Sequence, residues 1–98
     1  MKPYALHPEA EREYDQAAQY YLHDNPQAAA RFYDEIERLI QDVREQPDLF
    51  PVLSPPLRRH FSDVFPYALL YEDEPDRVWI VAVMHMKRRP GYWKPRVA

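Results

Sequence analysis

The chain has 98 residues, of which 46% are hydrophobic and 30% are charged, and its formal net charge is −3. This composition predicts one small globular domain, residues 1–98, and argues against intrinsic disorder. Cysteine is absent, which excludes disulfide and thiolate chemistry, and no apolar run approaches the ~20 residues needed to cross a membrane. A single glycine excludes the glycine-rich loops that bind nucleotide phosphates. We therefore expect a cytoplasmic protein with no membrane partner.

Charge is unevenly distributed between the two halves of the chain. Residues 1–50 carry 5 basic and 11 acidic side chains, net −6, whereas residues 51–98 carry 8 basic and 5 acidic ones, net +3. Basic side chains concentrate near the C-terminus in AVMHMKRRPGYWKPR, residues 82–96, a stretch that contains no acid. Such a region attracts phosphate, although a run of charge is more often simply a solvated face.

The first half of the chain predicts a short strand and two helices. Residues 2–6 have apolar side chains at alternate positions, which indicates an edge strand. A helix is expected from Pro8, because proline suits the first helical position and acidic residues follow it. Asn25 is placed to cap a second helix that starts at Pro26 and ends before Pro47. Its apolar positions have a regular 3–4 spacing: Phe32, Tyr33, Ile36, Leu39, Ile40 and Val43.

The second half predicts three strands. A proline-rich loop over residues 46–56 precedes strand patterns at 57–61, 64–72 and 77–85, which polar turn residues separate. Short turns favour an antiparallel meander, and the last pattern is apolar on both faces, as in a central strand. Strict alternation places Trp79, Val81, Val83 and His85 on one side of it. We expect an α+β fold, with the N-terminal strand and an antiparallel helical hairpin packed on a small antiparallel β-sheet.

Basic residues gather in two clusters that the meander brings together, Arg58-Arg59-His60 and Lys87-Arg88-Arg89. Histidine transfers protons near neutral pH, arginine binds phosphate and aromatic rings stack on bases. With His85 and Tyr92 nearby, these residue types suffice for metal-free cleavage of RNA. Ordinary structural roles are the alternative: histidines at strand ends are often just hydrogen-bonded, and Tyr92 and Trp93 could pin the tail to the domain. The histidines show no close ligand spacing, so we expect no metal and no other cofactor.

The order of these segments is that of a known family. The stretches PYALHPEAEREYDQAAQYY (3–21), AARFYDEIERLI (29–40), FPYALLY (65–71) and VWIVAVMHMKRRPGYWKPR (78–96) resemble the RelE/ParE superfamily of toxins from bacterial type II toxin–antitoxin systems. The resemblance covers nearly the whole chain. The H-x-x-R-x-P ending formed by His85, Arg88 and Pro90 is similar to that of members described as plasmid-stabilisation proteins. The resemblance implies a growth-inhibiting toxin that a cognate antitoxin holds silent, in a toxin–antitoxin hetero-oligomer.

Two mechanisms occur on this fold, so the resemblance leaves open whether the chain is an enzyme. RelE-like members cut mRNA in the ribosomal A site, whereas ParE-like members inhibit DNA gyrase. RelE-like nucleases carry an arginine within the strand that here reads FPYALLY, where the nearest position is Ala68. Loss of one such donor typically costs ~10²–10³-fold in rate. We therefore favour the ParE-like mechanism, with the ribosome-dependent mRNA interferase as the alternative and a non-toxic antitoxin-binding module as a second alternative.

Both mechanisms use the basic end of the chain, while the acidic hairpin serves as scaffold. For cleavage of mRNA, Arg59 and Arg88 are candidates for phosphate contact, His85 or His60 for proton transfer, and Tyr92 for orientation or stacking. Arginine and aromatic side chains are also enriched in protein-binding hot spots. The expected target-binding or nucleic-acid-binding residues are Arg58, Arg59, Lys87, Arg88, Arg89, Trp93, Lys94 and Arg96.

Overall fold

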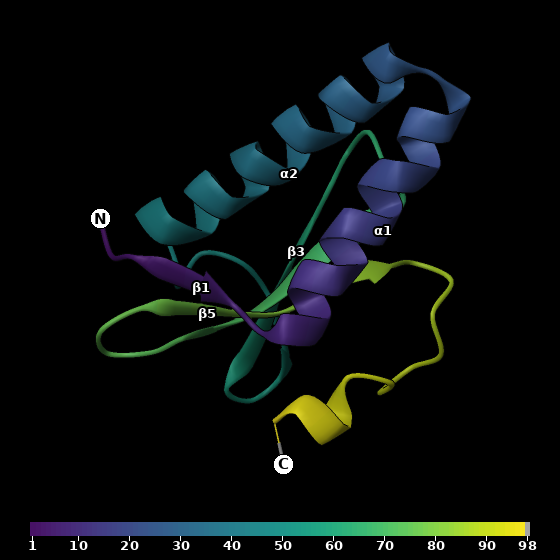
Figure 1. Cartoon of the computed structure of the whole chain (residues 1–98). Helices are drawn as coiled ribbons and strands as arrows, with labels where there is room; N and C mark the ends of the chain where they lie inside the picture. Colours follow the sequence, from purple (N-terminus) through teal and green to yellow (C-terminus); the bar gives the residue numbers. More distant parts are fainter. Residues whose placement is uncertain (98) are drawn as a thin grey trace.

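The computed structural model describes residues 1–97 and has two long helices packed on one sheet (Figure 1). This arrangement confirms the predicted α+β class and both helices. No helix among residues 1–97 combines the length and the hydrophobicity needed to cross a membrane. The elements in chain order are β1 (Tyr4–Leu6), α1 (Pro8–Asp24), α2 (Pro26–Glu45), β2 (Val52–Ser54), β3 (Leu57–Phe61), β4 (Tyr67–Asp73), β5 (Val78–His85) and the short 3₁₀ helix η1 (Lys94–Arg96).

A single residue, Asn25, joins the two helices. Its backbone N–H donates to the Tyr21 carbonyl at 2.9 Å and ends α1. Its side-chain oxygen accepts from the N–H of Ala28 at 2.7 Å and caps α2, as the sequence predicts. At the start of α1, the Nδ1 atom of His7 accepts from the N–H of Glu9 at 3.0 Å. Because this joint is so short, the helices lie side by side as an antiparallel hairpin (Figure 1).

The sheet contains five strands in the order β1-β5-β4-β3-β2. The β3–β4–β5 meander is antiparallel as predicted, but β1 runs parallel to β5, so the sheet is mixed rather than wholly antiparallel. Two helices and three strands separate β1 from β5, and no hairpin turn therefore constrains their relative direction. The predicted loop over 46–56 also contains the edge strand β2, which pairs with β3. Pro51 and Pro55 flank β2, and proline at these positions keeps the edge strand short.

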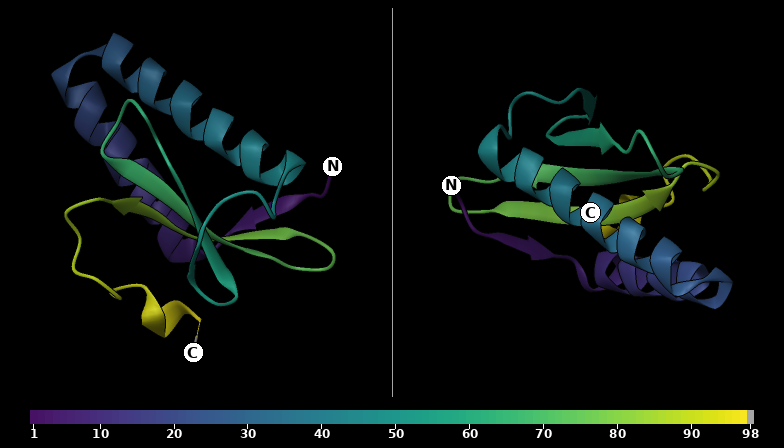
Figure 2. Two further views of the ribbon diagram at one scale, coloured as in Figure 1. Left: turned by 180° about the vertical axis from the view of Figure 1, so that it is seen from behind. Right: turned by 90° about the horizontal axis from the view of Figure 1, so that it is seen from above.

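The helices cover one face of the sheet and bury the main hydrophobic core (Figure 2). Phe32, Ile36 and Leu39 of α2 have no exposed surface, which confirms most of the predicted apolar stripe. Tyr33 departs from that stripe, since it is 44% exposed and its ring lies 5.5 Å from that of Tyr14 on the outside of the hairpin. The sheet contributes these fully buried residues to the core: Leu69, Tyr71, Val78, Ile80 and Val83.

A bulge in β5 changes which side chains face the helices. Tyr71 pairs with Ile80 whereas Leu70 pairs with Ala82, so Val81 is an additional residue in β5. The prediction of strict alternation along this strand is therefore wrong. Trp79 and Val81 lie on the face away from the helices, whereas Val83 belongs to the core beneath them. The cluster on the face away from the helices consists of Leu57, Ala68, Leu70, Val81, Ala82, Met84 and Trp93.

Candidate functional site

The basic C-terminal segment, residues 86–97, leaves the end of β5, loops outward and returns to finish below the start of α1 in the view of Figure 1. Gly91 turns the chain with a φ of +75°, a conformation in which other residues are strained. Trp93 is only 5% exposed and packs in the smaller cluster with Leu57 and Leu70. Trp93 therefore pins the segment to the sheet.

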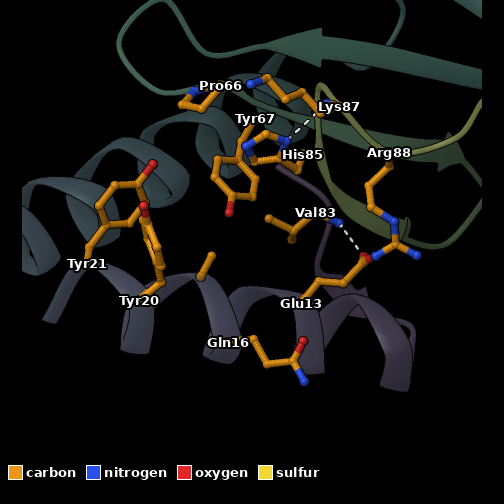
Figure 3. Close-up of a pocket in the computed structure, with 11 residues that line it drawn as sticks. Glu13, Gln16, Tyr20, Tyr21, Pro66, Tyr67, Val83, His85, Lys87 and Arg88 are labelled. Atoms are coloured by element: carbon orange, nitrogen blue, oxygen red, sulfur yellow. Dashed lines mark hydrogen bonds and ion pairs between the residues drawn. The ribbon is translucent and has the colours of Figure 1, made fainter. Parts of the chain in front are cut away.

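The C-terminal segment contains no acidic residue before its described end, but Glu13 of α1 contacts it. Glu13 lies between α1 and β5, where its Oε1 atom accepts from the N–H of Val83 at 3.1 Å (Figure 3). Its carboxylate also accepts from the Tyr92 hydroxyl at 2.6 Å and from two Arg96 nitrogens at 2.8 and 3.0 Å. Arg96 donates in addition to the Val81 carbonyl at 3.1 Å. Sequence reasoning missed Glu13 because these partners lie 70 to 83 residues away along the chain.

The polar groups of Tyr92 and Arg96 are thus used in contacts within the protein, with Glu13 and the Val81 carbonyl. The Arg96 side chain is 11% exposed, and its two terminal nitrogens face the Glu13 carboxylate as a fork. Burial, followed by the hydrogen bond to Glu13, raises the pKa of Tyr92, so this phenol stays protonated at neutral pH. These contacts give Tyr92, Trp93 and Arg96 a role in holding the segment in place.

The structure brings only part of the first basic cluster to the second. Successive residues of a strand point to opposite faces, so Arg59 lies on the face away from the helices while Arg58 and His60 lie on the other. Arg58 donates to the Phe50 carbonyl at 2.8 Å. The His60 ring stacks on Phe50 with centroids 3.7 Å apart, and its Nε2 atom lies 2.8 Å from an Asp42 oxygen. The expectation that both clusters meet is therefore wrong for Arg58 and His60.

A groove on the face away from the helices gathers cations from three segments and has a volume of about 400 Å³. Arg59 comes from β3, Arg88 follows β5, and Lys94 begins η1. None of the carboxylates of residues 1–97 lines this groove. We call it the basic groove, and its lining is Leu53, Ser54, Arg59, Met84, His85, Met86, Arg88, Pro90, Gly91, Trp93 and Lys94.

Aromatic rings support two of these cations. The Arg59 guanidinium lies 4.6 Å from the centre of the Phe61 ring, and the Arg88 guanidinium lies 3.9 Å from that of Tyr92. A ring under a guanidinium restricts its orientation but leaves its N–H edges available to a ligand. The carboxylate nearest to Arg88 is that of Glu13, at 3.9 Å.

His85 lies at the end of β5 and lines the basic groove. Its Nδ1 atom accepts from the backbone N–H of Lys87 at 3.0 Å, and its ring packs edge-on against Tyr67 (Figure 3). A neutral imidazole that accepts at Nδ1 carries its proton on Nε2. The free nitrogen of His85 is therefore a hydrogen-bond donor, whereas a general base needs an unprotonated nitrogen facing its substrate.

A second groove, between α1 and the ends of β4 and β5, has a volume of about 570 Å³ (Figure 3). Three tyrosines dominate its lining, and Tyr20 is 71% exposed. His85 and Arg88 line both grooves. The sequence contains one indication of this groove. Tyr20 and Tyr21 are adjacent on α1, so both cannot face the core and one aromatic ring must be exposed. We call it the tyrosine groove, and its lining is Glu13, Gln16, Ala17, Tyr20, Tyr21, Pro66, Tyr67, Val83, His85, Lys87 and Arg88.

Lys87 and Arg89, the remaining predicted site residues, are exposed beside these grooves. Lys87 lines the tyrosine groove, whereas Arg89 lines neither groove. Among residues 1–97, the structure contains no group of three or more histidine, cysteine, aspartate or glutamate side chains arranged to hold a metal ion. The two grooves therefore present cations, the His85 imidazole, the Glu13 carboxylate, hydroxyl groups and apolar side chains.

The helical hairpin, the mixed sheet and the basic end define a domain of the RelE/ParE toxin class. The family model described as the ParE toxin of the type II toxin–antitoxin system, parDE, matches residues 4–90, and the chain belongs to this family. A solved structure described as the chromosomal ParDE TA system from P. aeruginosa is similar, with a TM-score of 0.75 and 13% identity. The similarity covers 87% of this chain and 96% of that chain, and at this identity it shows a shared fold. A search of curated proteins found no significant match.

Proposed function

We propose that the protein is a growth-inhibiting toxin that acts on DNA gyrase and that an antitoxin silences it in a hetero-oligomer. Membership of the ParE toxin family supports the toxin role. The observation that carries the choice of gyrase over mRNA is the hydrogen bond that the Nδ1 atom of His85 accepts. Its Nδ1 atom is occupied by the Lys87 N–H, so its free nitrogen donates rather than accepts.

Two further positions support a mechanism without RNA cleavage. Ala68, where RelE-like nucleases carry an arginine, is fully buried and pairs in the sheet with Met84 of the basic groove. Alanine supplies no phosphate contact there. His60, the other candidate for proton transfer, lies on the helix side of the sheet against Phe50 and Asp42. It is thus separated from the basic groove by the sheet itself.

The target-binding surface that we propose is the exposed part of the basic end. Arg88, Arg89 and Lys87 follow β5, and Arg59 and Lys94 lie beside them in the basic groove. Exposed cations without neighbouring carboxylates favour an acidic or phosphate-rich target, because like-charge repulsion is absent. Arg58, Trp93 and Arg96, which sequence reasoning also assigned to this surface, are held by contacts within the fold and act in it as supports.

For the antitoxin, we propose the tyrosine groove as the docking site. Three tyrosines with Ala17, Pro66 and Val83 give it aromatic and apolar surface, and its three basic side chains outnumber its one acid, Glu13, which is paired with Arg96. A partner segment with apolar side chains followed by carboxylates complements this distribution. Because Arg88 also lines the basic groove, an antitoxin bound here would sit directly beside the proposed target-binding surface.

A ribosome-dependent mRNA interferase is the second candidate function. The observation that favours it is the convergence of Arg59, Arg88 and Lys94 on one groove that also contains His85. Cations of this kind can stabilise the charged transition state of phosphodiester cleavage. Under this mechanism the acid that protonates the leaving oxygen is the His85 imidazolium, whose formation releases the hydrogen bond from the Lys87 N–H, and another group must supply the base.

Expression of the chain in bacteria without its antitoxin separates these functions. We expect growth arrest, unchanged mRNA 5′ ends, and inhibition of plasmid supercoiling when the purified chain is added to DNA gyrase. New 5′ ends within codons of translated messages, with normal supercoiling, would establish the mRNA interferase instead. Normal growth together with normal supercoiling would leave the non-toxic antitoxin-binding module as the function.

A further inference from the structure

We propose that the basic groove is a binding site for the phosphodiester backbone of double-stranded DNA. The inference rests on the proposed function in one respect: an inhibitor of gyrase meets an enzyme that is bound to DNA. The charge of the groove, the support of its cations and its lining are independent of gyrase.

Cations from three separate segments converge on this groove without a carboxylate to neutralise them. Among residues 1–97, neither Arg59 nor Lys94 forms an ion pair, and the only carboxylate within 4.0 Å of Arg88 is that of Glu13, at 3.9 Å. In the described part of the chain, four of the other eight arginines have close acidic partners, such as Arg38 with Glu35 at 2.9 Å. A protein of net charge −3 that leaves two of these cations without an ion pair and the third with only a long one presents a local anion site.

Glu13, the nearest acid, is turned away from the groove by its own contacts. Its two oxygens accept from Val83, Tyr92 and Arg96, and it lines the tyrosine groove but not the basic groove. The bidentate pair with Arg96 offsets the negative charge of this carboxylate. The positive potential of the basic groove is therefore maintained even though an acid lies close by.

The cations are also held in position before a ligand arrives. Phe61 and Tyr92 lie beneath the guanidinium groups of Arg59 and Arg88. The stem of Lys94 crosses Gly91 so closely that a Cβ atom there would lie 3.0 Å from the Lys94 Cε atom. Restricting these long side chains in advance reduces the entropy lost when a ligand binds.

The lining favours backbone contact over recognition of bases. Of the side chains that read base edges, the lining has only cations, which bind phosphate as well as guanine; it has no asparagine or glutamine among residues 1–97, and Trp93 is too buried to offer a stacking face. Ser54, the free ring nitrogen of His85 and the three cations are the side-chain groups that can donate hydrogen bonds to phosphate oxygens. Single-stranded nucleic acid binds mainly by stacking on exposed aromatic rings, so duplex DNA is the form that this groove fits.

Fluorescence anisotropy with a labelled DNA duplex of about 20 base pairs, at several salt concentrations between about 50 and 200 mM, tests the site. We expect binding without sequence preference. Arg59→Gln and Lys94→Gln should each weaken it several-fold and reduce the slope of log K against log salt by about 1. Arg31→Gln, an exposed arginine on α2, is the matched control and should leave the slope unchanged. Thermal unfolding of each variant checks that the fold is retained, and Lys94, at an exposed position, keeps the test valid if Arg59→Gln unfolds.

Absence of duplex binding, or binding that both variants leave unchanged, would overturn the site even if the chain inhibits gyrase. Stronger binding to a single strand than to the duplex would overturn the choice of duplex. If both variants weaken binding to DNA-free gyrase and DNA itself is not bound, the groove recognises an acidic protein surface and the proposal is wrong. Duplex binding by a chain that leaves gyrase active would retain the DNA site and reject the proposed function instead.

Discussion

Among individual residues, Glu13 connects parts of the chain that are far apart in sequence. It accepts hydrogen bonds from Val83 in β5 and from Tyr92 and Arg96 in the C-terminal segment. The Glu13 and Arg96 side chains are each 11% exposed, so the pair is poorly screened by water. β1 pairs with β5 only as far as Ile80, so the backbone of Val81 and Val83 has no strand partner on that side. Glu13 accepts from the N–H of Val83, and Arg96 donates to the carbonyl of Val81.

Replacement of Glu13 tests this connection. Glu13→Gln retains one carbonyl oxygen but leaves the charge of Arg96 without a partner in a mostly desolvated position. We expect the free energy of unfolding, measured with urea, to fall by about 2–3 kcal/mol. Asp15→Asn, an exposed acid on the same helix, is the control and should change stability by less than about 0.5 kcal/mol. Equal stability of the two variants would show that the pair with Arg96 contributes nothing.

Between elements, a second acid joins α2 to the turn after β3. Glu35 is 8% exposed and accepts two hydrogen bonds from Arg38, at 2.9 and 3.0 Å, and one from the Ser62 hydroxyl at 2.6 Å. Ser62 in turn accepts from the N–H groups of Val64 and Phe65. The hydrogen bonds from Arg38, and to a lesser extent that from Ser62, lower the pKa of Glu35 below its ordinary value of 4.5.

This lowered pKa predicts a pH dependence of stability. A carboxyl whose pKa is lower in the folded state stabilises the fold fully above its unfolded pKa and loses that contribution as pH falls through the folded value. Glu35→Gln should therefore reduce the free energy of unfolding by about 1–2 kcal/mol at neutral pH. That deficit should shrink as pH falls below 4.5, because the unfolded state takes up its proton before folded Glu35 does. Urea denaturation at both pH values measures it, with Asp34→Asn on the exposed face of α2 as control. A deficit that is the same at both pH values would contradict the assignment.

Across the whole molecule, the acidic and basic halves of the sequence become two sides of one domain. The helical hairpin carries most of the acids of residues 1–50, and the basic groove faces away from it on the other side of the sheet. Hairpin and sheet bury the core together, whereas the C-terminal cations remain exposed. Stability and the proposed target binding therefore depend on different residues.

Removal of the exposed arginines tests this separation. The double variant Arg88→Ala, Arg89→Ala should abolish growth arrest on induction, because it removes two cations of the proposed target-binding surface. Its free energy of unfolding should stay within about 1 kcal/mol of wild type, since both side chains are exposed and Arg88 makes only a stacking contact and a long ion pair. The matched control is Arg12→Ala, Arg31→Ala on the helices, which should leave arrest intact. Unchanged arrest in the Arg88, Arg89 variant would refute the surface.

Local features of the chain were predictable because short-range physics decides them. Asn25 caps α2 with its own side chain. Pro8 and Pro26 begin helices at the first position, where the backbone N–H would have no partner within the helix and its absence in proline costs nothing. The apolar stripe of α2 requires no partner to be recognised, since its 3.6-residue period lies within the helix itself. Phe32 and Ile36 on that stripe are accordingly fully buried.

Features that depend on distant partners were not predictable. The direction of β1 is set by its pairing with β5, and the bulge at Val81 exists only in register with Leu70 and Tyr71. The candidate site follows the same division: the sequence identified Arg59, Arg88 and His85 as chemistry-bearing residues. The grouping of these three residues in one groove required the pairing of β3, β4 and β5, which brings Arg59 beside the end of β5.

The sequence by itself thus determined both long helices, four of the five strands, the α+β class, the family resemblance and the basic character of the C-terminal end. Each of these depends on residue type and on spacing over a few turns or strands. Only the tertiary structure decided that Glu13 holds the basic segment and that Trp93 and Arg96 support it. It also decided that the exposed cations meet in a groove that none of the carboxylates in the described part of the chain lines. Hydrogen bonds and ion pairs between residues 70 or more positions apart leave no periodic trace in the sequence, because folding alone brings such residues together.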